Sequence, residues 1–168
     1  MICIGDRLST SDQSIKIAEK YNKKAHVLHI TTKEEIDFLS QHKGNITFEI
    51  TPQHLTLVSP DCYNDLGTYA QMNPPIRSKD HQDRLWYAVK NNFVDIIGSD
   101  HAPHLKVNKD KKYPQSPSGM PGVQTLLPIM LDHMNKNKLS INQLVSFICE
   151  NPTKIFNINN KGYIKKGF

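Results

Sequence analysis

One stretch decides the fold of this chain: Val94–His104, with the sequence VDIIGSDHAPH. It opens with a short, mainly apolar and β-branched run, Val94–Ile97, which is long enough for one buried strand. The run stops at Gly98, and ionisable residues then follow, among them Asp100 and His104. Parallel α/β sheets present their sites at the carboxyl ends of strands. The stretch therefore predicts a site at a sheet edge, although a capping aspartate beside solvated histidines would fit it too.

The residues around this stretch predict alternating helices and strands. Apolar residues at helical spacing follow N-cap residues, and short apolar runs lie between these segments. Helices are predicted at 9–22, 31–43, 78–89, 123–134 and 140–148, a helical turn at 151–156, and strands at 25–30, 46–50 and 94–97. Prolines and glycines make 52–76 irregular and 105–122 a long loop. The order predicts an α/β fold with parallel strands, and no repeat or linker divides residues 1–168 into more than one domain.

Side-chain patterns make these helix predictions specific. The apolar residues expected to face the core are Ile15, Ala18 and Tyr21 in the first helix and Leu126, Leu127, Met130 and Leu131 in the helix at 123–134. Overlapping capping boxes, Thr31 with Glu34 and Thr32 with Glu35, should begin the second helix. Ser140 should cap the helix at 140–148.

Length and composition restrict the class of protein. The chain has 168 residues and a net charge of +5, carried mainly by scattered lysines. Nucleic-acid binding would favour arginines or a basic cluster with aromatics, so we expect none. Three distant cysteines without a CxxC motif argue against disulfides and a thiolate zinc site, and they fit the reducing cytosol. No signal-peptide layout or long apolar run is present, so we expect a cytoplasmic protein without a membrane span.

Two histidines and two carboxylates are placed for chemistry. His26 and His29 share a predicted strand, but residues three apart point to opposite faces, so they cannot share a metal from there. His29, at the carboxyl end, could reach the same rim as Asp100, whereas His26 should pack or face helices. Glu49 could face the same mouth or pair with a lysine. Imidazole and carboxylate suit zinc, which would acidify a bound water whose proton Asp100 accepts.

The stretch resembles a block of the type I dihydroorotases of the amidohydrolase superfamily. Four further blocks are similar and lie in the family's order. The five blocks are His26–Glu34, Glu49–Leu55, Gln71–Arg77, Ser99–His104 and Ser116–Thr125. They cover nearly the whole chain. The sister hydantoinases and allantoinases usually differ at the position of His104, which favours dihydroorotase.

The resemblance implies a role for each matching residue. His29 matches a zinc ligand, and Asp100 matches the aspartate that is both metal ligand and proton shuttle. Asn73 and His104 match positions that contact substrate, and Ser118-Gly119 matches the backbone that lines it. Dihydroorotases interconvert N-carbamoyl-L-aspartate and dihydroorotate in pyrimidine biosynthesis, so we expect this small molecule as the substrate of the completed enzyme.

The chain also departs from the family pattern. It contains no His-x-His pair, which the family carries on its first barrel strand, and residues 1–24 contain no histidine and no lysine in a recognisable strand. A complete barrel needs roughly 250 residues. The resemblance therefore implies the C-terminal half of a TIM-like (β/α) barrel, with helices outside and both ends cut. With only His29 and Asp100 left of the ligand set, zinc lacks the three protein ligands it needs, and we expect the chain to be inactive alone.

Half a barrel leaves two sheet edges and its inner face uncovered. We expect the missing N-terminal half, or self-association, to cover them. Two other functions stay open: a non-catalytic dihydroorotase-like partner of a pyrimidine-pathway enzyme, and a piece of a hydantoinase-type or allantoinase-type hydrolase.

Overall fold

A parallel sheet forms the centre of the computed structural model, which describes residues 2–4, 8–42 and 44–167. Its four strands, in the order β1-β2-β3-β4, are β1 (Ile2–Ile4), β2 (Ala25–Val27), β3 (Ile46–Ile50) and β4 (Ile96–Ile97). The predicted α/β fold with parallel strands is confirmed. Strand β1 was not predicted, because three residues before a helix are too short to show a period.

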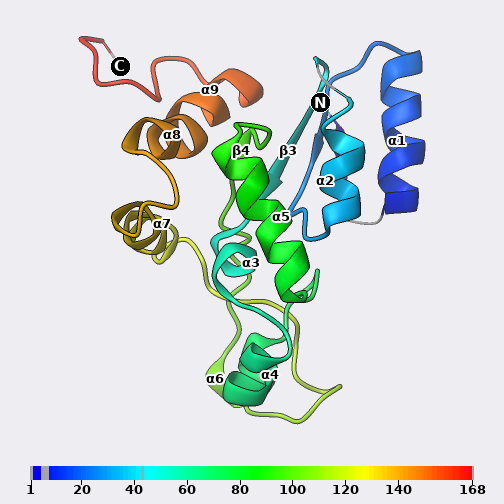
Figure 1. Ribbon diagram of the computed structural model, residues 1–168, viewed down its shortest axis with the longest axis vertical. Coiled ribbons are helices and arrows are strands. Elements are labelled where there is room, and N and C mark those ends of the chain that lie inside the picture. Colours follow the sequence, from blue (N-terminus) through cyan, green and yellow to red (C-terminus); the bar gives the residue numbers. More distant parts are fainter. Residues whose placement is uncertain (1, 5–7, 43, 168) are drawn as a thin grey trace.

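Three helices cover one face of the sheet: α1 (Leu8–Lys20), α2 (Lys33–Leu39) and α5 (Lys79–Lys90) (Figure 1). Burial alternates along β3, where Ile46, Phe48 and Ile50 are buried and the residues between them are half-buried. This alternation is the period of a strand with one face against helices. The prediction for the first helix was wrong at Tyr21, which lies beyond α1 and is 61% exposed.

The opposite face of the sheet is polar at its centre. His26 is fully buried there, with Nδ1 2.8 Å from the Thr47 hydroxyl and Nε2 3.3 Å from a carboxylate oxygen of Glu49. The ring of Phe156 meets the His26 ring edge-on at 5.6 Å. Phe156 ends helix α9 (Asn151–Phe156), so this helix covers part of the face that a half-barrel would otherwise leave open.

Short helices lie beyond the carboxyl end of the sheet (Figure 1). Residues 52–76, predicted to be irregular, contain α3 (Pro52–Thr56), α4 (Asp61–Leu66) and the 3-10 helix η1 (Gly67–Ala70). Each is short, as the prolines and glycine require. The loop at 105–122 contains one further turn, α6 (Lys106–Lys109). A second small apolar cluster forms here from Cys62, Ala70, Met72 and Ile76.

The last part of the chain is helical. Helix α7 (Leu126–Asn135) begins three residues later than predicted, and α8 (Ile141–Val145) continues through the π-helix η2 (Ser146–Glu150) into α9. Met130 is fully buried, but Leu127 is 46% exposed, so its predicted inward position was wrong. Across the described ranges, no helix has the length and apolar character needed to cross a membrane.

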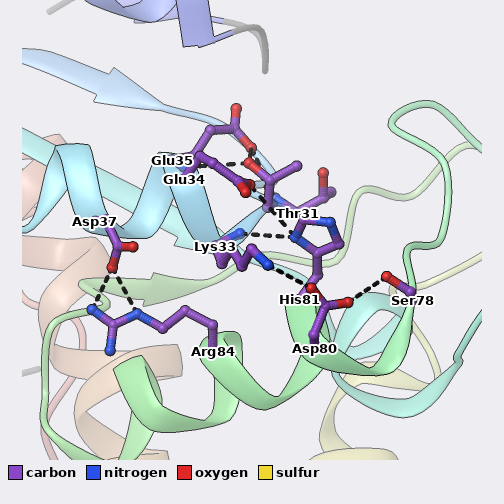
Figure 2. Close-up of polar contacts among 10 residues, drawn as sticks. Thr31, Lys33, Glu34, Glu35, Asp37, Ser78, Asp80, His81 and Arg84 are labelled. Carbon is purple, nitrogen blue, oxygen red and sulfur yellow. Dashed lines mark hydrogen bonds and ion pairs between the residues drawn. The ribbon is translucent and has the colours of Figure 1, made fainter.

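Hydrogen bonds fix the start of α2, and ion pairs join it to α5 (Figure 2). The capping box of Thr32 and Glu35 is present, as is that of Ser140 and Gln143. The buried Glu35 carboxylate accepts hydrogen bonds from the backbone of Thr31 and Thr32 and, at 2.7 Å, from the Thr32 hydroxyl. The predicted box from Thr31 to Glu34 does not form, because the Thr31 hydroxyl is buried without a partner.

Candidate active site at the carboxyl edge of the sheet

His29 and Asp100 leave the sheet at the same edge. Strand β2 ends at Val27, so His29 lies in a bend after the strand, not inside a strand running to Ile30 as predicted. The N–H of Ile30 donates to the Glu49 carbonyl at 2.8 Å, and the N–H of Gly98 donates to the Ile50 carbonyl at 2.9 Å. Both segments are therefore held to β3, which lies between β2 and β4.

Both residues also have left-handed backbones. The φ angle is 37° at His29 and 42° at Asp100. The other non-glycine residues recorded with positive φ are all asparagines: Asn22, Asn92, Asn137, Asn157 and Asn160. Asparagine adopts this region more easily than most residues, and strained backbone concentrates at functional sites. The strain at His29 and Asp100 supports a site at this edge.

The four residues predicted to contact substrate come together beside it. Asn73 and Ser118 line a pocket of about 710 Å³, together with Tyr63, Gln71, Tyr113 and others. His104 Nε2 donates to the Ser118 carbonyl at 2.8 Å, and the Gly119 N–H donates to the Gln71 carbonyl at 3.0 Å. Residues from three separate segments of the chain thus meet at this pocket.

Two glycines allow the loop to lie against the segment that carries Asp100. A Cβ on Gly119, which has φ +132°, would lie 2.6 Å from the Ala102 Cβ. A Cβ on Gly122 would lie 2.2 Å from the carbonyl oxygen of Ser99. The approach is held by His101 Nδ1, which accepts the N–H of Gly122 at 3.0 Å. Only glycine fits so close to another backbone.

His54 is a residue to which the sequence assigned no role. It is buried, its Nε2 donates to the Pro74 carbonyl at 3.1 Å, and its Nδ1 lies 2.7 Å from the Thr51 hydroxyl. The pKa of His54 is lowered to about 4, mainly by burial; the hydrogen bond to Pro74 opposes this shift, and nearby His29 and Arg77 add to it. The ring is therefore neutral at pH 7 and holds the backbone next to Asn73. This role depends on a contact 20 residues away, which no local pattern reveals.

The donors for a metal are only partly present. His29 Nδ1 is buried and has no hydrogen-bond partner, as a free ligand atom would be. Among residues 2–4, 8–42 and 44–167, however, no three His, Cys, Asp or Glu side chains are grouped so that they could hold a metal. Structural and catalytic zinc sites use at least three protein ligands. The described residues therefore do not make a zinc site by themselves.

This chain belongs to the amidohydrolase family, whose model matches residues 8–168. A dihydroorotase from Methanosphaera stadtmanae is 38% identical over 162 residues, which is 94% of this chain and 36% of that protein. A dihydroorotase from Halobacterium salinarum is 33% identical, over 93% of this chain and 36% of that protein. The sequence is therefore dihydroorotase-like, as predicted, and spans about a third of these relatives' length.

Solved structures confirm the partial barrel. The L-hydantoinase from Arthrobacter aurescens superposes with a TM-score of 0.88 at 29% identity, over 94% of this chain and 36% of that chain. The inactive dihydroorotase-like domain of a Chaetomium thermophilum multifunctional protein gives 0.74 at 20% identity, over 95% of this chain and 44% of that chain. At that identity the second likeness concerns the fold alone.

Proposed function

We propose that residues 1–168 act as one unit: the substrate-contacting and proton-transferring part of a dihydroorotase, which is inactive alone. The observation that carries this proposal is the convergence of Asn73, His104, Ser118 and Gly119 beside the segment of Asp100. The substrate would be dihydroorotate or N-carbamoyl-L-aspartate. The reaction opens or closes one cyclic amide bond.

Each side chain has a role that its contacts allow. His104 gives its Nε2–H to Ser118, which leaves Nδ1 to meet the substrate. The Asn73 amide offers both a donor and an acceptor from the pocket wall. Asp100 would carry a proton to the amide nitrogen that leaves as the ring opens.

The proposal requires a second contributor. In the completed barrel, His29 and Asp100 would join further ligands to hold zinc, and the polypeptide that supplies those ligands would be a second segment or chain. The working site would lie in the cytoplasm, where the free thiols of Cys62 and Cys149 would stay reduced.

Turnover of dihydroorotate by the purified chain with added zinc tests the first half of the proposal. We expect none above buffer, and clear conversion would contradict it. The second half is tested by co-expression with the part of the Methanosphaera stadtmanae dihydroorotase that precedes the matched region. We expect activity that Asp100→Asn abolishes. Zinc-dependent activity that Asp100→Asn leaves intact would show that the chain contributes no proton transfer.

A non-catalytic role is the second candidate. It is favoured because the described part of the chain groups too few metal donors. Two results together would support it: a stoichiometric complex with another pyrimidine-pathway enzyme, and no activity in any complementation. A hydantoinase-type or allantoinase-type substrate is the third, and the L-hydantoinase superposition favours it at the level of fold. A panel of cyclic amides offered to the complemented enzyme separates it from dihydroorotase.

A further inference from the structure

A buried lysine lies behind the pocket that holds Asn73 and Ser118. Lys109 ends helix α6 and is only 6% exposed, although the surrounding loop is polar and largely exposed. Its ammonium donates to the carbonyl oxygens of Gln71 and Pro117, each at 3.0 Å. Burial lowers the pKa of this amine. Moving an ammonium out of water costs free energy even when carbonyls accept its hydrogen bonds. A lysine that served only to keep the surface soluble would stay exposed.

The hydrogen bonds around Lys109 join two chain segments. Its own carbonyl accepts the hydroxyls of Thr68 at 2.7 Å and Ser116 at 3.3 Å. The side-chain amide of Gln71 donates to the Ser116 carbonyl at 3.0 Å and lies 3.3 Å from the Ser118 hydroxyl. The Gln71 carbonyl accepts hydrogen bonds from both the Lys109 ammonium and the Gly119 N–H.

Both of these segments line the pocket. Residues 68–73 supply Thr68, Gln71 and Asn73, and the loop at 116–119 supplies Ser118. The loop is otherwise tied to the sheet edge mainly through His104 and the glycine contacts. The Lys109 ammonium donates to one carbonyl on each segment, and it acts together with the direct hydrogen bonds from Gly119 to Gln71 and from Gln71 to Ser116.

We propose that Lys109 is a positioning residue that sets the distance between Asn73 and the Ser118-Gly119 backbone, and hence the fit of the cyclic-amide substrate. This inference rests on the proposed function for the identity of the substrate. The effect of Lys109 on the placement of residues 68–73 and 116–119 does not depend on the proposed function.

Amide hydrogen exchange in the isolated chain tests the placement without any activity. In Lys109→Met, which keeps the length of the side chain and removes its donors, we expect the Gly119 amide to exchange at least tenfold faster. Exchange of Phe48 and Ile50 in β3 should stay within twofold. Lys106→Met, on an exposed lysine of the same short helix, is the matched control and should change neither. Unchanged Gly119 exchange, or an equal acceleration at every amide, would overturn the inference.

Lys109→Arg decides the matter if the methionine variant does not fold. The guanidinium keeps the charge but presents a planar fork in place of a compact point donor. We expect Gly119 to exchange faster in Lys109→Arg than in the wild-type protein, and exchange at the wild-type rate would count against positioning. In the complemented enzyme, Lys109→Met should raise KM for dihydroorotate at least tenfold and change kcat less than threefold. If the wild-type complex is itself inactive, the proposed function fails while the exchange result still decides the role of Lys109.

Discussion

His104 Nε2 donates to the Ser118 carbonyl at 2.8 Å, so a residue of the segment after strand β4 holds a loop 14 positions further along the chain. This one bond connects the sheet edge that carries Asp100 with the pocket that Asn73 lines. Glycines at 119 and 122 make the approach possible, since neither position has room for a Cβ. The loop is thus packed against the sheet edge by backbone contacts.

Gly122→Ala should destabilise the chain by about 1–3 kcal/mol, because a Cβ would overlap the backbone carbonyl of Ser99, which cannot move aside. Gly98→Ala is the matched control. There the nearest atoms to the added Cβ belong to the end of the flexible Glu49 side chain and not to the backbone. Urea unfolding should show the larger loss for Gly122→Ala, and equal losses would refute a backbone cause.

His54 should make the chain less stable as the pH falls. Its pKa is about 4 in the folded chain, against an ordinary value of 6.5. Between these values the unfolded chain binds a proton that the folded chain does not, so stability is fully present above about pH 6.5 and is lost as the pH falls through 4. The pKa difference corresponds to a loss of about 3 kcal/mol.

Free energies of unfolding measured from pH 4 to 7 check this. His54→Gln should remove about one proton from the pH dependence in that window. An NMR titration should place the midpoint of the His54 ring near 4. A midpoint near 6.5 would show that the ring is not desolvated.

Replacing His29 or Asp100 by asparagine should lower activity without lowering stability. His29→Asn and Asp100→Asn place a residue that tolerates left-handed φ where φ is 37° and 42°, so we expect stability within about 0.5 kcal/mol of wild type. Complemented activity should fall at least a hundredfold. His26→Asn, on strand β2 just before His29, is the control: it removes two hydrogen-bonding contacts of the buried ring and its packing on Phe156, and should cost about 2 kcal/mol. A large stability loss at His29 or Asp100 would indicate a structural role.

Glu35 at the start of α2 and Arg84 on α5 allow a buried polar contact to be compared with an exposed one (Figure 2). Glu35→Ala should cost about 2 kcal/mol, because the buried carboxylate accepts three hydrogen bonds at the start of α2. Arg84→Ala breaks an exposed ion pair with Asp37 and should cost under about 1 kcal/mol. Thermal unfolding should be measured at low salt and at 0.5 M salt, where the screening length is about 4 Å. The added salt should reduce the stability loss caused by Arg84→Ala and leave that caused by Glu35→Ala unchanged. A salt-dependent Glu35 effect would contradict the buried assignment.

Local patterns in the sequence predicted most of the elements. Capping boxes at Thr32 and Ser140 and the strand at Ile46–Ile50 were confirmed because each depends on neighbours within a turn or a strand. The predictions for Tyr21 and Leu127 were wrong, because which residues of a helix are buried depends on the neighbouring elements. The roles assigned to His29, Asp100, Asn73, His104, Ser118 and Gly119 stay predictions.

The sequence by itself determined the alternation of strands and helices and the parallel sheet, since periodicity and capping are local properties of the chain. Only the tertiary structure decided that His29 and Asp100 adopt left-handed backbones, that His54 is neutral, and that Lys109 joins the two walls of the pocket. Each of these depends on burial and on partners far away in the chain, and such contacts exist only after the segments have packed together.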